Sequence, residues 1–97
     1  EYSDNRISLF SAQWGKCAIT GKPFKNTADI HCHHKKPKIQ GGGDNYDNLI
    51  LVLEPVHRLI HAVSDEAIQK YLQILNLNSE QILKLNELRK MCKNTEI

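Results

Sequence analysis

Long hydrophobic runs are missing from this chain of 97 residues. The longest aliphatic run, 49–53, stops at Glu54, whereas a membrane-spanning helix needs about 20 apolar residues. No N-terminal signal pattern is present either, so we expect a cytoplasmic protein with no membrane partner. A chain of this length has room for one modest hydrophobic core, and residues 1–97 are therefore expected to form a single domain.

An excess of charge of one sign is also missing. Thirteen Lys and Arg residues stand against eleven Asp and Glu residues, so the formal net charge is only +2 and predicts no particular partner. Cysteine is scarce as well. Cys17, Cys32 and Cys92 are an odd number spread along the chain, and they cannot form a complete disulfide framework. Reduced thiols are the expected state.

Histidine, by contrast, is concentrated in one third of the chain. All five histidines, His31, His33, His34, His57 and His61, fall between positions 31 and 61. His57 and His61 are four residues apart on a predicted helix, so their imidazoles share one face, about 6 Å apart, and one metal ion can bridge them. His33 and His34 end a predicted strand that a hairpin can hold against this helix, which predicts a three-histidine metal site. His31 is expected to be an exposed strand histidine.

The apolar pattern predicts the elements that carry these histidines. Ile7, Phe10 and Trp14 recur at helical spacing, which predicts a first helix over about residues 4–14. Residues 29–33 and 49–53 are predicted as two strands of a hairpin, joined by a loop that Pro37 and the glycines 41–43 impose. Pro55 then lies where the first position of the next helix is expected.

Two further helices are predicted in the C-terminal third. Ser64 begins a helix that runs to about Leu75, and Asn78 with Gln81 forms a capping box for a last helix that runs to about Cys92. Apolar residues at helical spacing predict that both helices complete the core. The expected fold class is therefore α+β, with an N-terminal helix, a hairpin, a short helix and a C-terminal helical pair.

Basic residues cluster beside the histidine pair. Lys35, Lys36 and Lys38 form the densest group. As a solvated loop they need no function, but beside a phosphodiester site they would suit phosphate contacts, as would Arg58. No aromatic residues interleave with these cations, which favours duplex over single-stranded DNA. Arg58 also occupies the position where a zinc protease motif needs a water-activating glutamate, so metalloprotease chemistry lacks its base.

These residues carry a family resemblance. The chain contains, in order, the string His33-His34-Lys35-Lys36-Pro37, then Gly42-Gly43, Asn48, His57 and His61. This pattern resembles the HNH nuclease motif, whose fold is the ββα-metal (His-Me finger) fold. The resemblance covers about residues 17–62 and is followed by a helical tail over 64–92. The wider sequence looks like the C-terminal endonuclease region of bacterial group II intron-encoded reverse transcriptase/maturases. The likeness lies in residues 7–13, in residues 57–62 and in the Leu- and Asn-rich tail. The resemblance implies that the chain is one domain of a longer polypeptide.

The resemblance also implies roles for individual residues. His34 would be the general base, His33 and His57 metal ligands, His61 a third ligand or a phosphate contact, and Asn48 the residue that holds the loop and orients the base. The implied cofactor is one divalent metal ion, Mg²⁺ or Mn²⁺ in function, with Zn²⁺ or Ni²⁺ as alternatives that imidazole ligands favour. The implied substrate is double-stranded DNA, nicked to leave a 3′-hydroxyl, with intron RNA reached through the parent polypeptide.

One departure from the family and two alternative functions remain at this point. Many HNH proteins carry two C-x-x-C pairs that bind a structural zinc ion. Here Cys17 is followed by Ala-Ile-Thr, and Val56 precedes His57 where a cysteine is often found. We therefore expect no structural zinc site, and we expect Cys17 to be a core residue. The chain is alternatively a stand-alone HNH homing or restriction nuclease. It is otherwise a non-catalytic zinc-bound module that binds nucleic acid, for which four closed ligands would be needed rather than three histidines.

Overall fold

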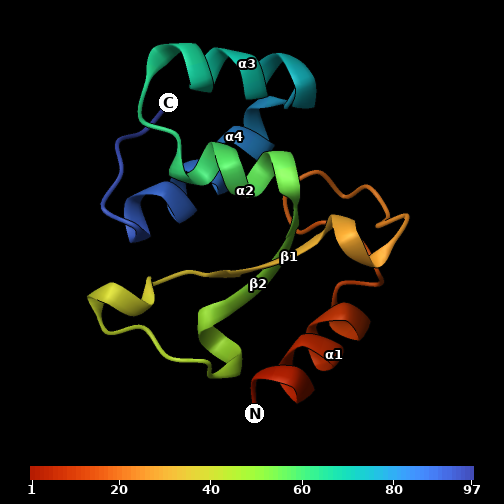
Figure 1. Ribbon diagram of the computed structural model, residues 1–97. Helices are drawn as coiled ribbons and strands as arrows, with labels where there is room; N and C mark the ends of the chain where they lie inside the picture. Colours follow the sequence, from red (N-terminus) through yellow and green to blue (C-terminus); the bar gives the residue numbers. More distant parts are fainter.

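A computed structural model describes all residues of the chain, 1–97. The helices and strands follow the order α1 (Tyr2–Ala12), β1 (Ile30–His34), β2 (Leu49–Leu53), α2 (Glu54–His61), α3 (Asp65–Leu75) and α4 (Ser79–Met91). The two strands form an antiparallel hairpin that lies between α1 and α2, while α3 and α4 lie on the far side of α2 (Figure 1). The predicted α+β class and the ββα unit are confirmed. No helix combines the length and the hydropathy of a membrane span.

Both faces of the hairpin are covered, which explains the unbroken aliphatic run of β2. Ile30 pairs with Leu53 and His34 with Leu49, so the register leaves no strand residue unpaired. Leu49 and Leu51 pack with Leu9 of α1, whereas Val52 belongs to the larger core cluster that includes α2. A strand that is buried on both sides needs apolar residues at every position rather than at alternate ones.

The short helix α2 divides into an apolar and a polar face. Val56, Leu59 and Ile60 are fully buried and anchor the helix in the core. Pro55 lies in the first turn, where its missing N–H costs no hydrogen bond. The opposite face carries His57 and His61, which therefore point away from the core of α2 and toward β1.

A buried arginine holds the C-terminal end of α2. The guanidinium of Arg89, in α4, has no exposed surface and donates hydrogen bonds to the carbonyls of Leu59 and Ala62. Asn94 donates to the carbonyls of Ile60 and Ala62. These are carbonyls that the end of a helix leaves without intrahelical partners, and the positive charge suits the negative end of the helix dipole. The last turn of α2 is thereby fixed to the C-terminal segment.

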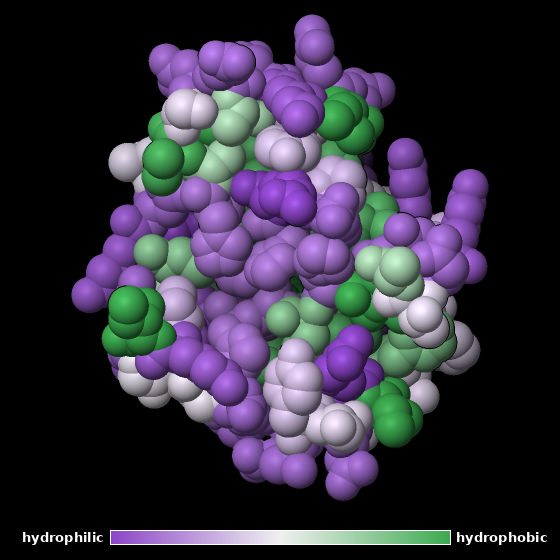
Figure 2. Space-filling model, in the orientation of Figure 1, coloured by the Kyte–Doolittle hydropathy of each residue, from purple (hydrophilic) through white to green (hydrophobic).

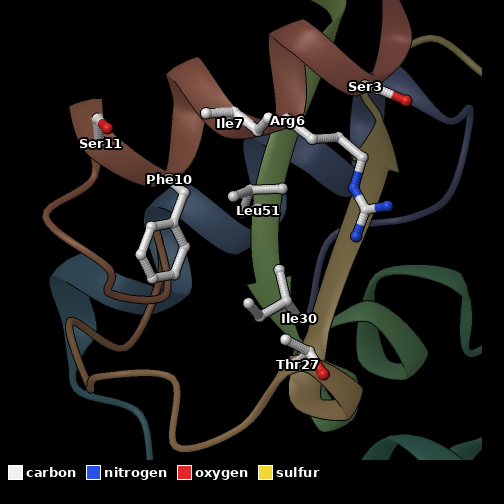
Figure 3. A pocket seen from close by; sticks show the side chains of 8 residues that line it. All are labelled: Ser3, Arg6, Ile7, Phe10, Ser11, Thr27, Ile30 and Leu51. Carbon is white, nitrogen blue, oxygen red and sulfur yellow. The ribbon is translucent and has the colours of Figure 1, made fainter.

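The first helix differs from its prediction. α1 begins at Tyr2 and ends at Ala12, and Trp14 lies outside it in a left-handed conformation (φ 57°), 85% exposed. Only Leu9 is buried in this helix, where it packs on Leu49 and Leu51 of the hairpin. Ile7 and Phe10 instead line a cavity of about 480 Å³ between α1 and the hairpin, with Ile30 and Leu51 on its other wall (Figure 3).

The helix caps of the C-terminal third are confirmed. The hydroxyl of Ser64 accepts a hydrogen bond from the backbone N–H of Ala67 at the start of α3. Both halves of the capping box between Asn78 and Gln81 are formed at the start of α4. Each of the two helices packs mainly on α2, so together they complete its core with Leu75, Leu85 and Leu88.

We expect the Arg89→Met substitution to lower the free energy of unfolding by about 1 to 3 kcal/mol, because hydrogen bonds from a charged donor to the end of α2 are lost. Urea unfolding measures the change. Lys90→Met is the matched control, since Lys90 has the same charge on the same helix but makes ion pairs only at the surface, with Glu87 and Glu96. Equal losses in the two variants would contradict the role given to Arg89.

Candidate metal centre and active site

Three imidazoles meet between β1 and α2. The ring centroid of His33 lies 5.1 Å from that of His57 and 5.1 Å from that of His61, and the His57 and His61 rings are 5.0 Å apart. His33 comes from β1, where alternation turns it toward α2, and the other two come from one face of α2. The structure therefore brings together the rings of the three residues that the resemblance implies as metal ligands, but the donor atoms that lie close enough to share one ion include those of His33 and His61 and not that of His57.

The close group of possible metal-binding atoms includes the sulfur of a cysteine. Ligand atoms of His33, His61 and Cys92 all lie within 4.8 Å of one another, and Cys92 Sγ is 3.7 Å from His33 Nε2. Cys92 is the C-terminal cap residue of α4, far from the histidines in sequence. The sequence interpretation gave it no role, and no spacing in the chain signals its position. Nitrogen and sulfur donors of this kind are those that bind Zn²⁺ and similar metals, so the group fits a divalent ion.

His57 turns one nitrogen toward another histidine. Its Nδ1 is 3.0 Å from Nδ1 of His31, whose Nε2 lies 3.8 Å from a carboxylate oxygen of Glu54. In a neutral pair one ring donates and the other accepts; if His57 donates, its Nε2 keeps the lone pair that a metal needs. His31 is therefore not simply an exposed strand residue, as the sequence suggested, but the hydrogen-bond partner of a candidate ligand.

Desolvation favours the neutral form of all three clustered imidazoles, of which His33 is buried, His57 half-buried and His61 exposed. Desolvation, followed by the charges of His57 and His61, lowers the pKa of His33 to about 3. Desolvation and the neighbouring charges, His61 first among them, lower the pKa of His57 to about 4. The pKa of His61 is also lowered, by desolvation and then by the charge of Arg89. Neutral imidazoles present lone pairs, which is the form that binds metal ions.

His34 lies on the other face of β1, against α1 and the hairpin loop. Its Nε2 is 2.7 Å from a carboxylate oxygen of Asp44, and its ring stacks on that of Tyr2 with centroids 5.9 Å apart. The hydrogen bond with His34 is the main cause that lowers the pKa of Asp44, so this carboxyl group is ionised. An ionised acceptor requires the proton on Nε2 of a neutral His34, which leaves the lone pair on Nδ1. Sequence reasoning assigned no role to Asp44.

Asn48 ties the two ends of the hairpin loop together. Its Nδ2 donates to the carbonyls of Lys36 and Gly43, at 3.0 and 2.9 Å, and its Oδ1 accepts from the backbone N–H of Lys36 at 2.9 Å. Gly42 makes this approach feasible, because a Cβ atom there would collide with the Lys36 carbonyl. The loop that carries Asp44 is thus fixed relative to the end of β1, where His34 lies.

The basic residues named from the sequence do not form one patch. Arg58 lines a cavity of about 420 Å³ beside the histidines, between α2 and α3, and Lys38 lies 3.4 Å from Asp44. Lys36 lines a separate polar hollow at the glycine loop, and Lys35 lines a mostly apolar hollow on the α4 side. Figure 2 shows hydrophilic side chains gathered across the middle of one face, below α2 and over the hairpin, with hydrophobic groups on either side.

Comparison with known families supports the resemblance in its coarser form. Residues 17–62, which span the hairpin, its loop and α2, match the model of the HNH endonuclease family. No curated protein matches the chain, and no solved structure does. The family match, together with the cluster of donor atoms, supports a nuclease domain with a divalent metal site.

The lowered histidine pKa values predict acid sensitivity of the metal-free protein. Because the pKa of His33 is about 3 in the folded state and near 6.5 when unfolded, the unfolded state binds more protons between these values. The free energy of unfolding should therefore fall by about 2 kcal/mol per such histidine as the pH drops from about 7 to about 5. Urea unfolding in the presence of a chelator measures this slope, and His33→Asn should flatten it. Equal stability at both pH values would contradict the neutral cluster.

Proposed function

We propose that this chain is a metal-dependent DNA endonuclease domain that nicks one strand of duplex DNA by hydrolysing a phosphodiester bond. The observation that carries the proposal is the pair of adjacent residues at the end of β1. His33 faces a cluster of metal-binding side chains, while His34 faces a carboxylate that holds its proton on Nε2. A metal-binding group and an oriented base are thus carried by neighbouring residues of one strand.

The base acts on water. Nδ1 of His34 takes a proton from a water molecule, whose oxygen attacks phosphorus, and the bond from phosphorus to the 3′-oxygen breaks. The leaving 3′-oxygen takes a proton from solvent water, so the products are a 3′-hydroxyl and a 5′-phosphate. Asp44 keeps the other ring nitrogen protonated and stabilises the imidazolium that forms. His33, His57 and His61 would hold a divalent metal ion, which when bound would stabilise the charge on the phosphate and the leaving oxygen.

Positive groups border this site on two sides. Arg58 lies beside His57 and His61, and Lys38 lies beside the His34 partner Asp44. Such residues suit contacts with phosphates on either side of a scissile bond, which position the duplex without reading its sequence. We include Lys35 and Lys36 as outer phosphate contacts along the continuing loop, further from the chemistry.

The finer proposal concerns the parent protein. The likeness of segments 7–13 and 57–62 to group II intron maturases supports a domain that nicks the second DNA strand and supplies the primer for reverse transcription of intron RNA. Sequencing the coding region upstream of residue 1 tests it. A reverse transcriptase in frame would support the maturase context, whereas any other upstream context would favour a homing or restriction nuclease with the same mechanism.

A non-catalytic zinc module is the second candidate, and one observation favours it. Cys92 adds a sulfur donor to the close group of His33 and His61, with the His57 ring adjacent, and four protein ligands are typical of structural zinc sites. Metal removal separates the two functions. A structural ion would be needed for folding, measured by circular dichroism after chelation, whereas a catalytic ion would be needed only for cleavage.

The nicking of supercoiled plasmid with Mg²⁺ or Mn²⁺ tests the endonuclease directly. We expect His34→Ala to slow nicking by about 10² to 10⁴-fold, the contribution of a general base, while metal affinity stays unchanged because His34 faces away from the cluster. Added imidazole should restore part of the rate in this variant and none in His33→Ala. Unchanged cleavage by His34→Ala would contradict the assignment of His34 as the general base.

The role of Asp44 is tested by its isosteric amide. Asp44→Asn removes the charge that fixes the His34 tautomer, and we expect a fall in kcat of at least about tenfold with little change in KM. The fall should be smaller than the loss of about 10⁴-fold that the same change causes at the buried aspartate of a Ser-His-Asp triad, since Asp44 is partly exposed. Asp47→Asn, an exposed acid in the same loop, is the matched control. An unaltered kcat in Asp44→Asn would remove Asp44 from the mechanism.

A further inference from the structure

Cys92 lies where a fourth protein ligand would be needed. Its sulfur is 3.7 Å from Nε2 of His33, and the donor atoms of Cys92, His33 and His61 lie within 4.8 Å of one another. His33 is 1% exposed, and the thiol is the only hydrogen-bond partner of its Nε2. A buried imidazole nitrogen is therefore aimed at a sulfur atom rather than at water.

The distance between these atoms matches a shared metal ion. Zn–S bonds of about 2.3 Å and Zn–N bonds of about 2.0 to 2.1 Å, at a tetrahedral angle, place the sulfur and nitrogen about 3.6 Å apart. The observed separation of 3.7 Å between Cys92 Sγ and His33 Nε2 is close to this sulfur–nitrogen distance. Binding would thus need almost no movement of Cys92 relative to His33, and the thiol proton would be released to solvent.

The other two cysteines have different surroundings. Cys17 is buried in the core, and its sulfur accepts a hydrogen bond from the backbone N–H of Leu53. Cys32 points to the opposite face of β1, where it packs with the α1 cluster. Only Cys92 has histidine donor atoms around it, and its thiol also donates a hydrogen bond to the carbonyl of Lys35, at 3.6 Å.

We propose that Cys92 is a ligand of the metal ion bound by His33 and His61, and that it makes the site selective for soft divalent metals such as Zn²⁺ and Co²⁺. Thiolate sulfur binds these ions strongly and has little affinity for Mg²⁺ or Mn²⁺, which prefer oxygen. The side chain at position 92 therefore decides which metals the site retains.

A consequence for regulation follows, which rests on the proposed nuclease function. His57 is the candidate for the fourth donor: its ring lies 5.1 and 5.0 Å from those of His33 and His61, but its donor atom lies outside the close group of donor atoms. With a reorientation of the His57 ring, Cys92 would complete four protein donors around a Zn²⁺ ion. Four protein ligands leave no position for water or a phosphate oxygen. The zinc form is then closed and inactive, whereas Mg²⁺ or Mn²⁺ leaves Cys92 unbound and the site open.

Cobalt spectroscopy tests the ligand without any assay of cleavage. Co²⁺ added to the wild-type protein should produce a thiolate-to-cobalt charge-transfer band in the near ultraviolet. The band should disappear in Cys92→Ser and persist in Cys32→Ser, the matched control with a half-buried cysteine on the other face of β1. Absence of the band in the wild type, or its persistence in Cys92→Ser, would overturn the proposal.

Affinity measurements give a second test. Competition with a chromophoric chelator should show Zn²⁺ affinity lowered at least about tenfold in Cys92→Ser, a loss that even outer-shell partners produce, with Mn²⁺ affinity unchanged. If Cys92→Ser does not fold, X-ray absorption of the zinc-loaded Cys17→Ala/Cys32→Ser protein decides instead. A sulfur neighbour at about 2.3 Å from zinc supports the proposal, and a shell of nitrogen and oxygen alone refutes it.

The two proposals fail in different ways. Cleavage with Mn²⁺ but no cobalt–thiolate band would leave the nuclease standing and remove Cys92 from the site. A cobalt–thiolate band without cleavage under any metal would keep Cys92 as a ligand and favour the non-catalytic zinc module. If both hold, Zn²⁺ should inhibit Mn²⁺-supported nicking by the wild type and inhibit Cys92→Ser much less; equal inhibition would refute the closed zinc form.

Discussion

The buried guanidinium of Arg89 is the contact on which the geometry of the site depends. It binds the carbonyls of Leu59 and Ala62, at the end of the short helix that carries His57 and His61. The same arginine lies one turn before Cys92 at the end of α4. One set of charge-assisted hydrogen bonds therefore fixes two elements at once, and with them the histidines and the cysteine that converge on His33. A helix of this length would not hold its last turn without such partners.

The alternation of β1 separates two chemical tasks. His33 points toward α2 and the cluster of imidazoles, and His34 points toward α1 and Asp44. Consecutive strand residues face opposite sides of a sheet, so a metal-binding group and a proton acceptor stand side by side in sequence without competing for one environment. Desolvation lowers the pKa of His33 on the first side, whereas on the second side a carboxylate of lowered pKa, Asp44, makes a hydrogen bond with His34 Nε2.

Much of the fold could be predicted because its signals are local. The aliphatic run 49–53 is the strand β2, and the capping box of Asn78 and Gln81 begins α4. The spacing of His57 and His61 on one helix face is likewise local. The buried face of α1 could not be predicted in the same way, because helical spacing does not tell which apolar residues meet the hairpin; Leu9 does, and Trp14 does not.

By itself the sequence determined the element types, the order of the HNH-like motif and the pairing of histidines on a strand and a helix. Only the tertiary structure decided that Cys92 lies against His33, that His31 contacts His57 and that Asp44 holds His34. Periodicity within a helix or strand follows from backbone geometry, which neighbouring residues share. Contacts between side chains from distant segments depend instead on how whole helices and strands pack. The spacing of residues along the chain does not encode the distance between such side chains.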